Sequence, residues 1–263
     1  MSAGRTADGR EDAGREGAGR QGTGREGTGR EGTRHVFSRP APPEAPRVAV
    51  LIPATDTAVE RELPGLLGGR AGLHVARMRL PSVTLDGLLA LEEDAVRQAE
   101  ALAPIRPALT VFACTSGSFV RGRVYEDRLT DRLAAATGAP VVTAARAMVT
   151  ALRAEGGRVR LRASYTEDIV AAERRYLESF GLTVTDARGL GITEDEETAR
   201  VGAGELIRFA RDAPPGDDAT VTMLSCTNLR TAEVLAELRQ GIGLPVVSSN
   251  LALAAAVREA LGP

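Results

Sequence analysis

Two cysteines are the residues of this 263-residue chain whose type and spacing could do chemistry. Cys114 follows the apolar run 111–113, Cys226 follows the run 221–225, and a threonine comes after each cysteine. A short apolar run predicts a buried strand, and small polar residues after it predict a turn that begins a helix. The unpaired N–H groups and positive dipole end of a helix start favour a thiolate and can bind an anion. The sequence therefore predicts two reactive thiols, each where a strand gives way to a helix.

The chain repeats its own plan around these cysteines. Residues 47–56 match 158–167 at an offset of 111, and the cysteines lie 112 positions apart. Residues 138–143 also match 243–248, at an offset of 105. Short β-branched runs alternate with helical periods, so we expect strands at 47–53, 73–79, 108–113, 140–143, 157–163, 182–187, 219–224 and 244–248, and a last helix at 250–261. Such alternation is typical of parallel sheets with helices on both faces. The sequence thus predicts an α/β protein made of two similar halves.

The predicted division of the chain follows from this repeat. We place the first half at 47–143, completed by the C-terminal helix within 250–263, and the second half at 144–249. Each half carries one cysteine at the carboxyl end of its third strand, where open α/β sheets bind their ligands. Two such halves facing each other would set the thiols on opposite sides of one small cleft.

Residues 1–46 form a tract rich in Gly, Arg, Glu and Thr that ends in a Pro-rich joint. The tract has almost nothing apolar to bury, so we expect it to be disordered. Its arginines are interleaved with acidic residues. This favours a solvated extension, or upstream sequence added by a misplaced start codon, over an RNA-binding or tethering tail.

Composition excludes several classes of function. All 33 basic residues are Arg, so the chain has no lysine with which to form a Schiff base. A net charge of −2 with mixed signs provides no basic face for nucleic acid, and no apolar run approaches the length of a membrane span. Two widely spaced cysteines without a hydrophobic signal segment predict a cytoplasmic protein.

The cysteines also have structural interpretations. Either could be a small buried hydrophobe, as most free cysteines are, although their duplicated context argues against this for the pair. A disulfide is disfavoured by a reducing compartment. We expect no metal, because there is no Cys-x-x-Cys pair, His35 lies in the tail and His74 lies in a predicted strand.

Three motifs together resemble a known family. They are Cys-Thr-Ser-Gly-Ser-Phe at 114–119, Ser-Cys-Thr-Asn-Leu-Arg-Thr at 225–231 and Pro-Val-Val-Ser-Ser-Asn at 245–250. They resemble the maleate cis-trans isomerase group of the aspartate/glutamate racemase superfamily, which includes arylmalonate decarboxylase and a protein of ectoine utilisation. The resemblance covers residues 47–263. It implies two pseudo-symmetric flavodoxin-like (Rossmann-like) halves with the active site between them, no cofactor, and a small carboxylate as substrate; we also expect a homo-oligomer.

The resemblance implies a role for particular side chains. Cys114 would be the nucleophile or first base, and Cys226 the second acid/base. The residues that would hold the substrate carboxylate are Thr115, Ser116, Thr227 and Asn228, with Tyr165 reaching it from the second half. Tyr165 could instead be a packed aromatic, whereas Tyr125 and Tyr176 look structural and Asn250 could shape the site or cap the last helix.

Asp56 departs from the family pattern. The isomerases carry Asn in a Pro-x-x-Asn-Thr turn, where this chain has Asp56 followed by Thr57, and the loop 188–198 lacks the second expected Asn. An ionised Asp at about 4 Å would repel a carboxylate by on the order of 4 kcal/mol at an effective dielectric near 20. Asp56 would suit a substrate that carries an amine, could remain protonated, could partner a catalytic thiol, or could cap the first helix.

Four functions therefore stay open. In a cofactor-independent cis-trans isomerase, the Cys114 thiolate adds to an alkene carbon, the resulting single bond rotates, and elimination releases the trans acid while Cys226 exchanges a proton. In a racemase, one cysteine removes a proton next to the carboxylate and the other delivers one to the opposite face. A decarboxylase needs only one thiol, and a non-catalytic protein would simply bind a small acid.

Overall fold

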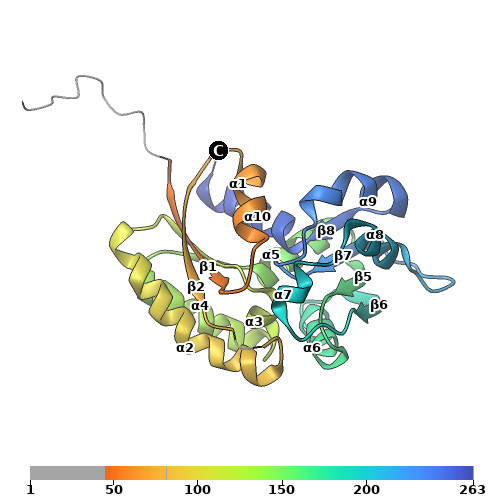
Figure 1. Cartoon of the computed structure of the whole chain (residues 1–263), viewed down its shortest axis with the longest axis horizontal. Helices are drawn as coiled ribbons and strands as arrows, with labels where there is room; N and C mark the ends of the chain where they lie inside the picture. The colour runs from red at the N-terminus through yellow and green to blue at the C-terminus, as the bar shows by residue number, and fades with distance from the viewer. Residues whose placement is uncertain (1–44, 81, 263) are drawn as a thin grey trace, which may run out of the picture. The chain divides into compact units, whose positions relative to one another are not determined.

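Eight strands build two parallel sheets in this computed structural model, which describes residues 45–80 and 82–262 (Figure 1). The first sheet has the order β2-β1-β3-β4, with bounds β1 Arg47–Pro53, β2 Gly72–Met78, β3 Leu109–Phe112 and β4 Val141–Thr143. The second has the order β6-β5-β7-β8, with bounds β5 Arg158–Ala163, β6 Thr183–Gly189, β7 Val221–Ser225 and β8 Val246–Ser248. The same order in both sheets confirms the predicted fold of two similar α/β halves. The predicted tail lies outside the described residues, apart from residues 45 and 46.

Helices connect the strands as the alternating pattern predicts. Before β5 they are α1 Val59–Leu67, α2 Leu85–Leu102, η1 Ala103–Ile105, α3 Thr115–Phe119, α4 Arg123–Thr137 and α5 Ala144–Ala154. After β5 come α6 Glu167–Glu178, α7 Asp195–Thr198, α8 Ala203–Arg211, η2 Ala232–Val234, α9 Leu235–Ile242 and α10 Ser249–Leu261. Among the described residues, every helix is too short or too polar to cross a membrane.

The repeated Pro-Val-Val motif has the same structural role in both halves. Thr143 follows it in the first half, and its hydroxyl accepts from the N–H of Arg146 at 3.1 Å to cap α5. Ser248 follows it in the second half and caps α10 by accepting from the N–H of Leu251 at 3.3 Å. A side-chain cap satisfies an N–H group that lacks an intrahelical partner. The duplication is therefore visible in local hydrogen bonding as well as in sheet order.

The C-terminal helix α10 lies against elements of both predicted halves. It packs on α1 of the first half and on α5, which follows the predicted boundary at residue 143. The guanidinium of Arg258 donates to the carbonyl of Leu66 at 2.6 Å, and the amide of Asn250 donates to Glu62 at 2.8 Å. The assignment of α10 to the first half, like the domain boundaries, stays a prediction.

Aromatic packing joins α3 of the first half to the second half. The ring of Phe119 lies 6.1 Å from that of Tyr165 and 6.0 Å from that of Tyr176, centroid to centroid. The hydroxyl of Tyr176 donates to the buried carboxylate of Glu126 in α4 at 2.7 Å. Tyr176 is thus a structural residue that fixes α6 against α4.

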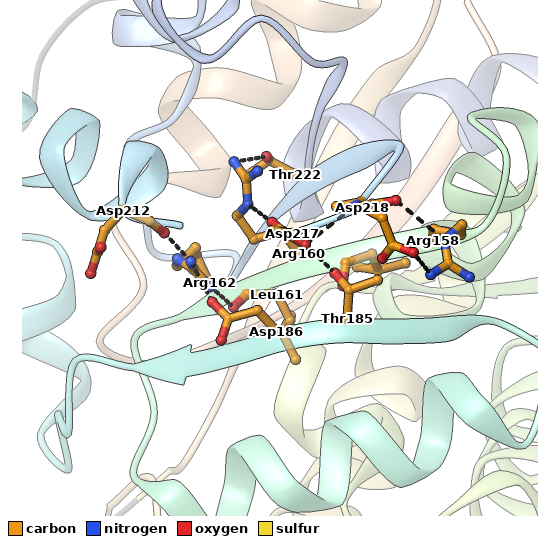
Figure 2. A network of polar contacts seen from close by, with 12 residues as sticks. Arg158, Arg160, Leu161, Arg162, Thr185, Asp186, Asp212, Asp217, Asp218 and Thr222 are labelled. Carbon is orange, nitrogen blue, oxygen red and sulfur yellow. Dashed lines mark hydrogen bonds and ion pairs between the residues drawn. The ribbon is translucent and has the colours of Figure 1, made fainter. Parts of the chain in front are cut away.

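The central strand of the second sheet carries a ladder of arginines, shown in Figure 2. Arg158, Arg160 and Arg162 alternate along β5 and so share one face of the sheet. Ion pairs compensate them, because Arg160 lies 2.5 Å from Asp217 and Arg162 lies 2.6 Å from Asp186.

Arg162 has a second role in this ladder. It is fully buried and also donates to the carbonyl of Phe209 at 3.1 Å and to that of Asp212, at the C-terminal end of α8. Carbonyls in the last turn of a helix have no intrahelical donor, and a cation there is favourable.

We predict that Arg162→Ala lowers the free energy of unfolding by about 3 kcal/mol, because Asp186 and the last carbonyls of α8 would lose their buried partner. Urea denaturation followed by circular dichroism measures this change. Arg174→Ala is the control: Arg174 pairs with Glu178 in an exposed i,i+4 arrangement, whose loss should cost less than about 0.5 kcal/mol. Equal effects of the two substitutions would contradict the role assigned to Arg162.

Candidate active site

Both cysteines lie just beyond the carboxyl ends of equivalent strands, Cys114 after β3 and Cys226 after β7. Cys114 is the N-cap residue of the short helix α3, as the sequence predicts. The prediction of a helix directly after Cys226 is wrong, because residues 227–229 form a turn and a bend and the 3₁₀ helix η2 begins only at Ala232. Cys226 itself has a φ of 148°, which is uncommon for a residue with a side chain. Strain of this kind persists only where the surrounding structure enforces it.

Ser249 joins the two cysteine turns. Its hydroxyl accepts from the hydroxyl of Thr115 at 3.0 Å and from the N–H of Cys226 at 3.1 Å. A second link runs from the hydroxyl of Thr227 to the carbonyl of Ala113 at 3.3 Å. Thr115, after the first cysteine, is therefore linked to the second turn through Ser249, and Thr227, after the second cysteine, bonds directly to the residue before Cys114. The structure thus brings together the two turns that the sequence predicts to form one site.

Both thiols are neutral at pH 7. Cys114 is 3% exposed and burial raises its pKa to about 12, although the N–H of Gly117 and the hydroxyl of Ser116 partly oppose the shift. Burial also raises the pKa of Cys226, which is 7% exposed, and the charge of Asp195 adds to the rise. The sequence predicted that helix starts would favour thiolates. Burial outweighs that effect, because removal from water penalises the charged form.

Gly117 shows how closely the first turn surrounds its sulfur. A Cβ on Gly117 would lie 3.0 Å from Sγ of Cys114 and 2.9 Å from Leu91. The Cys-Thr-Ser-Gly sequence therefore needs a residue without a side chain at this position, so that the chain can fold back over the thiol.

Tyr165 brings an unpaired hydroxyl to the cysteines. It is 1% exposed, and among the described residues its hydroxyl has no hydrogen-bond partner. Burial raises its pKa well above the usual value, and the charges of Cys226, Glu173 and Cys114 act in the same direction. The ring packs edge-on against Phe119. Tyr165 is thus a packed aromatic, as one alternative predicted, and its role as a donor to the substrate stays a prediction.

The side chains of three proposed carboxylate ligands already bond to other groups of the protein; these residues are Thr115, Thr227 and Asn228. The two threonine hydroxyls bond as described above. The amide of Asn228 donates to the carbonyl of Asp195 at 2.9 Å and to its Oδ2 at 3.1 Å, and its Oδ1 accepts from the N–H of Thr57 at 3.0 Å. What these residues still offer a ligand is backbone N–H groups.

Asp56 caps the first helix with one oxygen only. Its Oδ1 accepts from the N–H groups of Ala58 and Val59, both at 2.9 Å, as one sequence interpretation predicted. Its Oδ2 is buried and has no partner in residues 45–80 and 82–262. Burial, together with the charge of Asp195, raises the pKa of Asp56 to about 7.

Two further acids belong to this cluster, and sequence reasoning missed both. Asp195 in α7 accepts from the hydroxyl of Thr55 at 2.6 Å, and burial raises its pKa. Glu173 in α6 is fully buried, accepts from the hydroxyl of Ser225 at 2.6 Å, and has its pKa raised by burial to about 8. Glu173 could have been found as the one acid on the apolar face of its helix. Nothing in the sequence distinguishes Asp195 from the exposed acids Glu196 and Glu197.

The segment after β6 covers this cluster. Its N–H groups at Gly191 and Ile192 donate to the carbonyls of Tyr165 and Ser164 at 3.0 and 2.9 Å. Its carbonyl at Thr193 accepts from the N–H of Val83 at 2.8 Å, which ties it to the first half. A separate cavity of about 590 Å³ lies between α4, β4, α5 and α10 and includes Glu126 and Arg146. Within residues 45–80 and 82–262, no group of three His, Cys, Asp or Glu could hold a metal.

We predict slow alkylation of both thiols at pH 7, measured with iodoacetamide on Cys226→Ala and Cys114→Ala proteins, each of which retains one thiol. The thiolate is the reactive form. Because the folded pKa of Cys114 is about 12, its rate should rise about tenfold per pH unit from pH 9 to about pH 11, whereas the rate of a free cysteine with a pKa of about 8.5 levels off over this range. Urea-unfolded protein is the control. A rate that levels off below pH 8 in the folded protein would contradict the neutral thiols.

The sequence is similar to those of known proteins. Residues 48–262 match the family model of arylmalonate decarboxylase. The arylmalonate decarboxylase of Bordetella bronchiseptica is 34% identical over 209 residues, 78% of this chain and 83% of that protein. The maleate isomerase of Geobacillus stearothermophilus is 26% identical over 217 residues, 77% of this chain and 86% of that protein.

The fold is also similar to solved structures of proteins of the same two kinds. A Nocardia farcinica maleate cis-trans isomerase mutant with a covalently bound succinylcysteine intermediate superposes with a TM-score of 0.78 at 25% identity, covering 82% of this chain and 93% of that one. A double mutant of arylmalonate decarboxylase in its liganded form gives 0.77 at 30% identity, covering 83% and 93%. The chain therefore belongs to the arylmalonate decarboxylase family, whose curated relatives are isomerases and a decarboxylase, as the resemblance of its cysteine motifs implied.

Proposed function

We propose that this protein is a cofactor-independent isomerase that acts on a small carboxylic acid through Cys114 and Cys226. The observation that carries the proposal is the pair of cysteine turns joined by the hydroxyl of Ser249. Two thiols on equivalent strand ends can serve opposite faces of one small molecule. A cis-trans isomerase and a racemase both need two groups that exchange protons or add to carbon.

The electrostatics of the pair fit a division of labour. Each sulfur accepts two hydrogen bonds that favour its thiolate, from the N–H of Gly117 and the hydroxyl of Ser116 at Cys114, and from the hydroxyl of Ser164 and the N–H of Asn228 at Cys226. Burial and the charge of Asp195 raise the pKa of Cys226 further than that of Cys114, so we assign Cys114 as the nucleophile or first base and Cys226 as the proton donor. The isomerase reaction begins from the form in which Cys114 has lost its proton to solvent and Cys226 keeps its own. The Cys114 thiolate bonds to one alkene carbon, Cys226 protonates the other, and the C–C bond rotates. Return of that proton to Cys226 and cleavage of the C–S bond restore the alkene.

Donors for the substrate carboxylate are also present. The Tyr165 hydroxyl has no protein acceptor among the described residues and is electrostatically coupled to both thiols. The N–H groups of Thr115 and Ser116 stand in the first turn of α3, where a helix has no internal acceptors. Together they can hold the oxyanion that develops when the α-carbon loses a proton or is attacked.

Arylmalonate-type decarboxylation is the second candidate. The 34% identity to a curated decarboxylase favours it, and one thiol would suffice to protonate the carbanion left by loss of CO2. The two candidates differ in what they require of the cysteines, so the same variants separate them.

We expect Cys114→Ala and Cys226→Ala each to reduce turnover by at least about 10²-fold while the unfolding midpoint changes little, because general acid–base groups contribute about that much. The assays are maleate to fumarate, label uptake from deuterated water at the α-carbon of chiral acids, and CO2 release from an arylmalonate. Loss of activity in only one variant, with CO2 released, would favour the decarboxylase. Full activity in both would overturn the two-thiol proposal.

We also expect Tyr165→Phe to lower turnover by about 10- to 10²-fold with little loss of stability, since among the described residues the hydroxyl interacts only with the thiol of Cys226 and remains free to bond to substrate. Tyr176→Phe is the matched control. Its hydroxyl bonds to Glu126, so its removal should lower the unfolding midpoint and leave turnover unchanged. Unchanged turnover in Tyr165→Phe would remove Tyr165 from the proposed site.

A further inference from the structure

Two buried carboxyl groups from different halves meet beside the cysteine turns. Asp56 follows β1 and is fully buried, and Asp195 in α7 is 7% exposed. The chain holds both in place: Thr55 donates to Asp195 at 2.6 Å, Asn228 bonds to Asp195 and to the N–H of Thr57, and the N–H groups of Ala58 and Val59 hold Asp56. The pair is thus a built feature, fixed in part by hydrogen bonds between residues 140 and 171 positions apart.

No cation accompanies this pair among residues 45–80 and 82–262. The charged side chains that act on the acids are other carboxyls, since Asp195 raises the pKa of Asp56 and Glu196 raises that of Asp195. Arg77 lies close by, but it donates to the backbone carbonyls of Ala54 and Asp56 and to the carboxylate of Glu60. Buried acids are ordinarily paired with a cation, so this pair is unusual.

The Oδ2 atom of Asp56 could accept a hydrogen bond from a ligand. Its Oδ1 completes the start of α1, but its Oδ2 is buried and accepts no hydrogen bond by distance and angle in the described chain. The hydroxyl of Thr227, which is close enough to lower the pKa of Asp56, donates to the carbonyl of Ala113 at 3.3 Å. A structural helix cap needs only one oxygen. The second oxygen is an acceptor placed in the same cluster as both thiols, whose pKa values respond to the charge of Asp56.

We propose that Asp56 and Asp195 form the subsite for a protonated amine on the substrate, so that the protein handles a small amino-carboxylate in preference to a dicarboxylate. This inference rests on the proposed function for the carboxylate end of the substrate. An ammonium group brings three donors and one positive charge, which match two acids that lack a counter-ion. A second carboxylate would meet like charge in a buried setting.

Binding of an amine should release a proton. The groups that face Asp56 are Asp195 from α7 and the thiols of Cys114 and Cys226 from the turns after β3 and β7. The thiols remain neutral near pH 7, whereas Asp56, with a pKa of about 7, is half protonated there. An ammonium favours the carboxylate form, lowers the pKa of Asp56 and expels its proton.

The test uses calorimetry on the full chain with three probes that share a four-atom chain: butyrate, β-alanine and succinate. None has a double bond or stereocentre, so none is turned over. We expect β-alanine to bind at least about tenfold more tightly than butyrate, with succinate weakest. At pH 7, β-alanine binding should release protons, shown by heats that depend on the ionisation enthalpy of the buffer, and butyrate binding should not.

Asp56→Asn is the decisive variant, because an amide keeps the oxygen that accepts from the N–H groups of α1. It should lose the preference for β-alanine and the proton release, and should gain affinity for succinate. Asp168→Asn, which removes an exposed carboxylate from the first turn of α6, is the matched control and should change nothing.

The two proposals can fail separately. Succinate binding as tightly as β-alanine, no effect of Asp56→Asn, or no binding of any probe would overturn the amine subsite. The cysteine variants would still decide the proposed function by their turnover. Amine selectivity in a protein whose cysteine variants keep full activity would instead overturn the two-thiol mechanism and leave the subsite standing.

Discussion

The hydroxyl of Ser249 is the contact on which the arrangement of the site depends. It accepts hydrogen bonds from both cysteine turns, one through the side chain of Thr115 and one through the backbone of Cys226. Its neighbours at the start of α10 act in the same region, since Ser248 bonds to Thr231 and Asn250 bonds to the carbonyl of Thr227. Three consecutive polar residues therefore hold the second cysteine turn against the first. The last helix of the chain is as much a part of the site as the strands that carry the sulfurs.

Burial sets the chemistry of the groups held in this way. The pKa values of Cys114, Cys226, Asp56, Asp195, Tyr165 and Glu173 are all raised, and burial is the largest cause for each. Each of these groups is consequently less charged than it would be in water. A cluster of this kind responds strongly to any charge that a ligand introduces, because the low dielectric of the interior strengthens each interaction.

Sequence reasoning predicted the elements that local patterns determine. Alternating apolar runs located all eight strands within a few residues, and the repeat around Cys114 and Cys226 predicted equivalent positions for them. Sequence reasoning failed where contacts between residues far apart in the sequence determine the local structure. The turn after Cys226 replaces a helix because its polar residues bond to other elements, and the buried role of Asp195 depends on Thr55, 140 positions away. The neutral state of the thiols likewise follows from packing that neither motif records.

The arginine ladder of β5 shows how far the two halves have diverged since they were alike. The positions of β1 that match Arg160 and Arg162 in the repeat are Ala49 and Leu51, both fully buried among apolar neighbours. In the second half, the arginines on the equivalent strand are compensated by ion pairs with the aspartates at 186 and 217. The strands β1 and β5 are therefore no longer interchangeable. Replacing the residues of β5 with those of β1 would bring alanine and leucine to those aspartates, and replacing the residues of β1 with those of β5 would bury two arginines away from them.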